Sequence, residues 1–175
     1  MSRRQSKQDR LVSWTFNSPA NVGPSSAAKI IQFYVVECPA EGASKRGLTF
    51  SQLGWRGARF STLQARMRKS STLTADRWKC EKLCDIESQI EKSPLNAQSP
   101  LRQEYALYAK SKNYGKVESL FYLIRCALAH GSFDVRTYKK ERYYLFENRY
   151  RNQLRGRAVL KEKTLLRWID ETKLV

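Results

Sequence analysis

The stretch KVESLFYLIRCALAHG, residues 116–131, decides how the rest of the sequence is interpreted. Apolar side chains recur along it three and four residues apart, which is the spacing of one face of an α-helix. Leu123, Ala127 and Ala129 make other faces of the helix apolar as well, and a helix that is apolar nearly all round is buried on most sides. The stretch therefore predicts a buried helix that ends at Gly131, the residue type favoured just after a helix C-terminus.

Two residues of this stretch, Arg125 and His130, have side chains suited to ligand binding or catalysis. Arg125 stands among apolar neighbours, where a charge is costly unless it is paired. Either Glu118 or another acid neutralises it, or it faces a cavity or interface meant for an anion. His130 is the only histidine of the chain, and the helix dipole in the last turn favours its protonated form.

A permanent cation beside a titratable group fits phosphodiester chemistry without a metal. Arg125 would bind phosphate oxygens through its planar fork, and His130 would move protons. The alternative is a structural arginine followed by a histidine that caps the helix, because an arginine and a histidine five residues apart also occur by chance.

The charge balance points to a polyanionic partner. The chain has 175 residues, of which 33 are Lys or Arg and 16 are Asp or Glu, so its formal net charge is +17. Such an excess favours nucleic acid first and an anionic membrane surface second. The length and the hydrophobic content of 41% predict one globular domain.

The cysteines and the chain start bear on location and cofactors. The first residues lack the apolar region of a secretory signal, and no stretch approaches the roughly 20 apolar residues of a membrane span. We therefore expect a cytoplasmic protein whose four cysteines are thiols. Cys80 and Cys84 stand four residues apart, whereas zinc sites use tighter pairs, so we expect no metal and no cofactor.

The chain divides into three predicted parts. Residues 1–24 form a basic, flexible N-terminal segment rich in turn residues. Residues 25–131 form a helical core, with helices expected over 27–37, within 49–71, over 74–92 and, with a break at 113–115, over 101–131. Ser25 or Ser26 would cap the first helix, although its β-branched residues leave a strand open. Residues 132–175 form a β-hairpin, a short third strand at 155–161 and an amphipathic C-terminal helix.

The segment 55–69 is a second basic feature. Phe60, Leu63 and Met67 predict a helix here, and no acidic residue lies between Trp55 and Lys69. Charges of one sign are unfavourable on a helix without compensating acids. We therefore expect this segment to contact nucleic-acid phosphates, through Arg56, Arg59, Arg66, Arg68 and Lys69.

The sequence SLFYLIRCALAHGSF, residues 119–133, resembles the signature helix of the HEPN superfamily of nucleotide-binding proteins. That family carries an arginine and a histidine separated by four to six residues, and here Arg125 and His130 match, with Ala129 and Gly131 flanking the histidine. The region downstream resembles the β-hairpin and final helix of some bacterial, often plasmid-borne, members. The similarity covers residues 105–172.

The resemblance implies a mainly α-helical, up-and-down bundle that forms a homodimer, with two motifs facing each other in one cleft. It implies a metal-independent endoribonuclease, acting as a toxin or defence effector, with an antitoxin or regulatory protein as a further partner. Arg125 would stabilise the phosphorane and His130 would be the acid and base. Attack by a 2′-OH makes RNA the substrate.

One residue departs from the family pattern. The position after the arginine is commonly Asn or Asp in the family, and here it is Cys126, a weak donor and acceptor. Two other functions therefore remain open: a non-catalytic RNA-binding module, and a basic structural subunit that docks an acidic partner.

Overall fold

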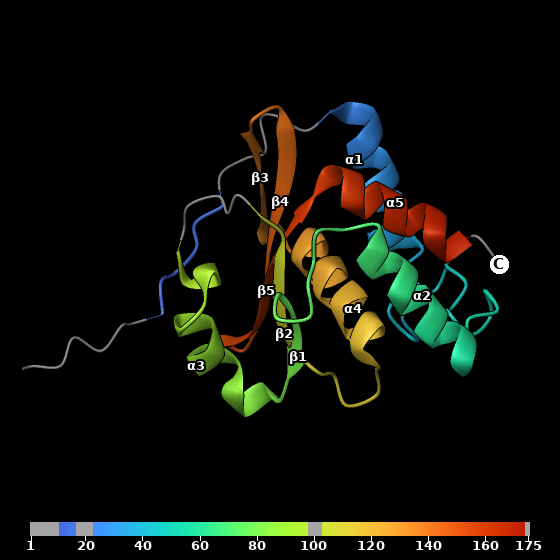
Figure 1. The fold of residues 1–175 in the computed structure, drawn as a ribbon, viewed down its shortest axis with the longest axis horizontal. Helices are drawn as coiled ribbons and strands as arrows, with labels where there is room; N and C mark the ends of the chain where they lie inside the picture. Colours follow the sequence, from blue (N-terminus) through green and yellow to red (C-terminus); the bar gives the residue numbers. More distant parts are fainter. Residues whose placement is uncertain (1–10, 17–22, 98–102, 174–175) are drawn as a thin grey trace, which may run out of the picture.

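The computed structural model describes residues 11–16, 23–97 and 103–173. Its centre is a sheet of five strands in the order β1-β2-β5-β4-β3 (Figure 1). Strands β1 and β2 are parallel, and the other neighbours are antiparallel. The strands are β1 (Trp78–Glu81), β2 (Tyr105–Ala109), β3 (Phe133–Tyr138), β4 (Glu141–Tyr150) and β5 (Gln153–Lys161).

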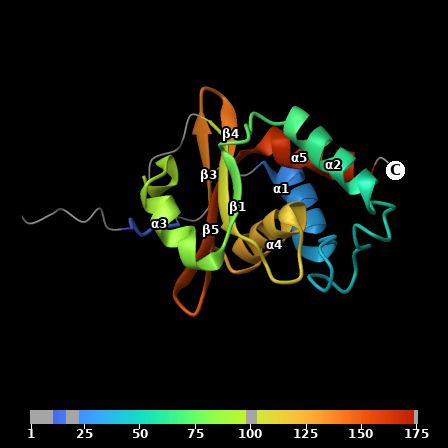
Figure 2. The ribbon, with the colours of Figure 1, turned by 60° about the horizontal axis from the view of Figure 1, so that its bottom comes forward.

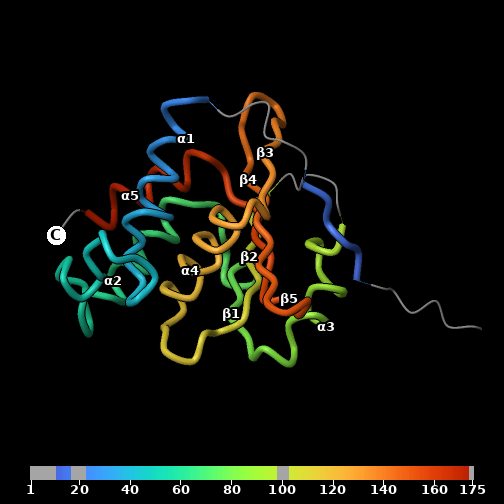
Figure 3. Tube along the Cα trace, turned by 180° about the vertical axis from the view of Figure 1, so that it is seen from behind, coloured from blue at the N-terminus to red at the C-terminus, as the bar shows by residue number. Residues whose placement is uncertain are grey.

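Helices cover both faces of this sheet (Figure 2). On one face lie α1 (Pro24–Ile31), which continues into a π-helical turn (Gln32–Val36), α2 (Ala58–Lys69), α4 (Lys116–Ala129) and α5 (Glu162–Lys173). On the other face lies α3 (Ile86–Glu91), between two 3₁₀ turns (Leu83–Asp85 and Pro94–Asn96). The view from behind shows the same separation of layers (Figure 3).

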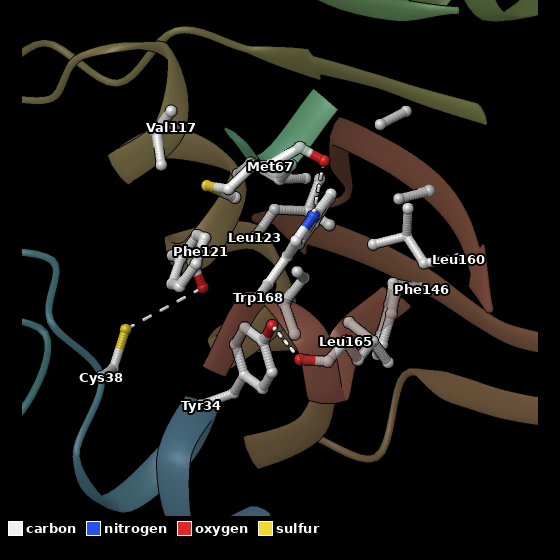
Figure 4. Close-up of a cluster of buried hydrophobic side chains, with 14 of the residues drawn as sticks. Tyr34, Cys38, Met67, Val117, Phe121, Leu123, Phe146, Leu160, Leu165 and Trp168 are labelled. Carbon is white, nitrogen blue, oxygen red and sulfur yellow. Dashed lines mark hydrogen bonds between the residues drawn. The ribbon is translucent and has the colours of Figure 1, made fainter. Parts of the chain in front are cut away.

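Each face of the sheet has its own hydrophobic core. On the α4 side, Trp168 stacks on Trp78 with ring centroids 5.6 Å apart, and its indole Nε1 donates to the carbonyl of Met67 at 2.9 Å (Figure 4). The hydroxyl of Tyr34 donates to the carbonyl of Leu165 at 3.0 Å. On the α3 side a smaller cluster forms around Trp14, Ile86, Ile90, Leu95, Leu145 and Leu154.

The predicted helical bundle is wrong, because the protein has an α/β fold built on a mixed sheet. Residues 105–109 form a strand where we expected helix, and so do residues 78–81. Leu107 packs on the α3 side of the sheet, whereas Ala106 and Tyr108 pack on the α4 side. A strand buried on both faces is an unbroken apolar run, and periodicity alone does not distinguish it from a buried helix.

Other expected elements are confirmed. The helix around Leu63 and Met67 is α2, the break at 113–115 precedes α4, and the hairpin, third strand and final helix are β3, β4, β5 and α5. The serine cap is not present: α1 begins after Gly23, without a side-chain cap. Most of the N-terminal 1–24 segment lies outside the described residues. None of the described helices is both long enough and apolar enough to span a bilayer.

Candidate functional site

A cleft of about 550 Å³ opens beside the C-terminal half of α4. Three parts of the chain surround it: α4 itself, the loop between β2 and α4, and the end of the β4–β5 hairpin. Arg125, Cys126 and His130, which the sequence analysis singled out, all line this cleft. The remaining residues that line it are Ser111, Asn113, Tyr114, Tyr122, Asn148, Arg149, Tyr150 and Arg155.

Local interactions at its two ends fix α4 in place. At the N-terminus the amide of Gly115 donates to Glu118 Oε2 at 2.9 Å, so the carboxylate of Glu118 caps the helix. At the C-terminus the amide of Ser132 donates to the carbonyl of Ala127 at 2.8 Å, and Gly131 has a φ of 69°. This is a Schellman motif, which confirms the predicted role of Gly131 and leaves His130 exposed as the C-cap residue that follows Ala129.

Arg125 has no counter-ion among the described residues. Its Nε is buried and makes no hydrogen bond within the described part of the chain, and no described carboxylate lies within ion-pair distance of it. The sequence left two alternatives for Arg125: neutralisation by an acid, or a position facing a cavity. The structure has the second arrangement. An unsatisfied buried guanidinium nitrogen costs free energy that a bound anion would recover.

A β-bulge directs Arg155 into the same cleft. Asn148 pairs with Gly156 and the next residue, Arg149, pairs with Leu154, so Arg155 has no residue opposite it. In a regular strand Arg155 would share a face with Arg157, which lies on the α3 side with Leu95 and Trp14. Bulges re-aim side chains in this way beside functional sites. The Nε of Arg155 is also buried without a partner among the described residues.

Gly156 allows α4 to approach the sheet at the floor of the cleft. A Cβ atom at this position would lie 2.6 Å from Leu123 Cδ1 and 2.6 Å from Tyr108 Cβ. Real Cβ atoms do not come so close, so a larger residue would push α4 away from β5. The glycine therefore helps to set the separation between Arg125 on α4 and Arg155 on β5.

The third arginine of the cleft is paired. Arg149 Nε donates to Glu147 Oε1 at 2.7 Å, and the second carboxylate oxygen of Glu147 binds Arg157. No Asp or Glu is among the described residues that line the cleft. The positive charges of Arg125 and Arg155 therefore face the cleft uncompensated, an arrangement that attracts anions.

Two titratable groups near the arginines, Tyr122 and Cys38, have raised pKa values. The neighbouring Cys126 sulfur raises the pKa of Tyr122, burial raises it further, and Arg125 and Arg155 oppose these effects. Burial raises the pKa of the Cys38 thiol to about 11, against the opposing effect of Arg125. Histidine is the side chain most often used for general acid–base catalysis, so His130 is the best candidate for proton transfer in the cleft.

The basic segment 55–69 lies elsewhere. It forms α2, which packs on α5, and none of its residues is among those that line the cleft. Arg56, Arg59, Arg66 and Lys69 are exposed, whereas the guanidinium of Arg68 lies 5.8 Å from the centre of the Trp78 ring. The RNA contacts expected from this segment stay a prediction.

The sequence reasoning missed the contribution of the β4–β5 hairpin. Arg149, Tyr150 and Arg155 all line the cleft, and none of them was a predicted site residue. A signal was present: RYRNQLRGR, residues 149–157, holds four arginines and no acid. Its distance along the chain from Arg125 concealed the connection.

Among the described residues, no group of three or more His, Cys, Asp or Glu side chains could hold a metal ion. No protein-family model, curated protein or solved structure matches the chain.

Proposed function

We propose that this protein binds RNA in the cleft and cleaves it as a metal-independent endoribonuclease. The observation that carries the proposal is that Arg125 and His130 line one open cleft in which Arg125 has no counter-ion and no described carboxylate lines the wall. A carboxylate-free cationic cleft favours phosphate, and a histidine beside it supplies a group that can move a proton.

The reaction would proceed by internal transfer within the RNA. The imidazole of His130 accepts the proton of a ribose 2′-OH, whose oxygen attacks the adjacent phosphorus. Arg125 holds the phosphate oxygens and stabilises the negative charge of the phosphorane. The bond from phosphorus to the 5′ oxygen breaks, and the protonated imidazole returns the proton to that oxygen. The products are a 2′,3′-cyclic phosphate and a 5′-OH.

The proposal rests on the cleft, because the bundle that the HEPN resemblance implies is not the fold of this chain. A role as a toxin or defence effector in the cytoplasm, with an antitoxin as partner, is proposed from that resemblance alone. The homodimer also stays a proposal. The helix α4 does not itself require a partner chain, because most of its apolar residues are buried within this one chain.

The test is incubation of the purified protein with mixed RNAs in EDTA, wild type beside His130→Ala. We expect His130→Ala to lose roughly 10²–10⁴-fold in cleavage rate, as for a general acid–base group, with its melting temperature unchanged because His130 is exposed. Arg125→Lys should also fail, since an ammonium does not reproduce the bidentate fork. Equal cleavage by wild type and His130→Ala, or cleavage that needs Mg²⁺, contradicts the mechanism.

A second candidate is RNA binding without cleavage. Cys126, where the family pattern has a polar residue, is the observation that favours it. Binding of RNA by wild type and His130→Ala, with cleavage by neither, would establish this function. Cys126→Asn would then be the variant in which to look for restored cleavage.

A further inference from the structure

Tyr150 is an unusually exposed aromatic side chain. Among the described residues the large apolar side chains that lie exposed are Val12, Ile31, Leu48 and Tyr150. Tyr150 is 56% exposed, and it is the one member of this group that lines the cleft. An exposed aromatic ring at a cationic cleft is a surface on which a flat, apolar ligand group can pack.

The hairpin tip holds this ring in a defined position. Tyr150 pairs with Gln153 across a two-residue turn, in which Arg151 and Asn152 have φ angles of 50° and 63°. Two left-handed residues define the tight turn that suits the twist of a β-hairpin. Arg149 Nη1 donates to the carbonyl of Asn152 at 3.3 Å, which braces the turn further.

Positive charge surrounds the ring. The guanidinium groups of Arg151 and Arg155 each lie 5.3 Å from the centre of the Tyr150 ring. Arg151 is exposed on the turn, so its flexible side chain can leave the ring for a phosphate. Arg155 lies beside the ring and also lines the cleft with an unpartnered Nε, so it connects the ring to the phosphate-binding wall.

We infer that Tyr150 and Arg155 form a nucleotide subsite, in which an unpaired base stacks on the Tyr150 ring and its phosphate binds Arg155. This inference rests on the proposed function and specifies which RNA the cleft accepts. A base inside a duplex is stacked on both faces and has no face to offer the ring, whereas a single strand does. Since every base has a π-face, the subsite selects unpaired RNA with little regard to sequence.

The experiment measures fluorescence anisotropy with two labelled oligomers of equal length. One is oligoadenylate with 2′-O-methyl riboses, which lacks the attacking hydroxyl and so cannot be cleaved by the proposed route. The other has the same backbone without bases. Wild type is compared with Tyr150→Ala and Tyr150→Phe, with Leu48→Ala as the matched control, because Leu48 is 57% exposed and lies outside the cleft. Circular dichroism checks that each variant is folded.

We expect Tyr150→Ala to bind oligoadenylate roughly tenfold to a hundredfold more weakly than wild type, the loss typical of one stacked base. Tyr150→Phe should bind like wild type, because it keeps the ring, and Leu48→Ala should also bind normally. Tyr150→Ala and wild type should bind the oligomer without bases equally. Annealing oligoadenylate to its complement should weaken wild-type binding.

Two failures are distinguishable. If Tyr150→Ala binds oligoadenylate as tightly as wild type while Arg125→Ala binds it weakly, the base subsite is wrong and the proposed RNA cleft stands. If wild type binds neither oligomer, the proposed function fails and the subsite fails with it. Tighter binding of the annealed duplex than of the single strand by wild type would also overturn the inference.

Discussion

Arg155 and Arg157 stand two residues apart on β5 and have opposite environments. Arg157 is fully buried on the α3 side of the sheet, where its guanidinium binds Glu147 and the carbonyls of Leu95 and Val12. Arg155 is turned to the α4 side, and its buried Nε has no partner among the described residues. The same side chain on the same strand is therefore satisfied on one face and unsatisfied on the other.

The difference separates a structural cation from a candidate ligand-binding one. Burial lowers the pKa of Arg157, and Glu147 opposes this shift, while the guanidinium also lies 4.5 Å from the centre of the Trp14 ring. These contacts join the N-terminal segment 11–16 to the sheet. Arg155 joins no part of the described chain by an ion pair, so its positive charge remains available to an anion in the cleft.

The largest expected loss of stability comes from replacing Arg157, the arginine that is paired within the fold. Arg157→Met should lower the free energy of unfolding by about 3–5 kcal/mol, because it leaves the buried carboxylate of Glu147 with less compensation. Urea denaturation measures this change. The matched variant is Arg157→Met combined with Glu147→Leu, which removes both charges and should be more stable than Arg157→Met alone. A double variant that is less stable than the single one would contradict this account of Arg157.

Next in size is the effect of filling the space between α4 and β5. Gly156→Ala places a methyl group against Leu123 and Tyr108, and we expect it to lower the free energy of unfolding by about 1–3 kcal/mol, as overpacking does. Leu123→Ala on the same background should recover part of this loss by making room. No recovery would mean that the clash lies with Tyr108, whose backbone is less able to move.

The next effect is on RNA binding and not on stability. It is expected at Arg155, whose buried Nε has no partner among the described residues. Arg155→Ala should weaken RNA binding roughly tenfold, the value of a hydrogen bond to a charged group, and flatten the salt dependence by about 0.7 in slope. Stability should not fall, because the side chain has no described ion pair to lose. Arg59→Ala on α2 is the matched comparison, and a larger loss there than at Arg155 would move the RNA-binding surface to α2.

The smallest expected effect on stability comes from the carboxylate of Glu141, the first residue of β4, at the end of the strand away from the β4–β5 turn. Hydrogen bonds from Lys161 and Lys163 lower the pKa of Glu141 to about 2. Since the folded pKa lies below the unfolded value of about 4.3, the stabilisation is present above that value and is lost as the pH falls towards 2. Glu141→Gln should therefore cost less than about 1 kcal/mol at neutral pH, because the pair is partly exposed.

Urea denaturation of wild type and Glu141→Gln at neutral pH and at about pH 2 tests this sign. The difference in the free energy of unfolding between the two proteins should shrink at the lower pH. A difference that grows on acidification would show that Glu141 is not held ionised by its lysines.

The sequence by itself determined α4, its termination at Gly131, and the placement of both Arg125 and His130 near its C-terminal end. It also determined the hairpin and the final helix. These depend on local features, namely helical spacing, a left-handed glycine and alternating strands, which the nearby residues specify. The strong positive charge is likewise a property of composition alone.

Only the tertiary structure decided that residues 78–81 and 105–109 are strands and that the hairpin completes the cleft. Strand β2 pairs with β5, about fifty residues further along the chain, and its burial on both faces removes the alternation that marks a strand. The direction of Arg155 depends on a bulge, and a bulge is set by register between two strands. Because the register exists only once the strands have paired, the local sequence does not specify which arginine is buried with a partner and which faces the cleft.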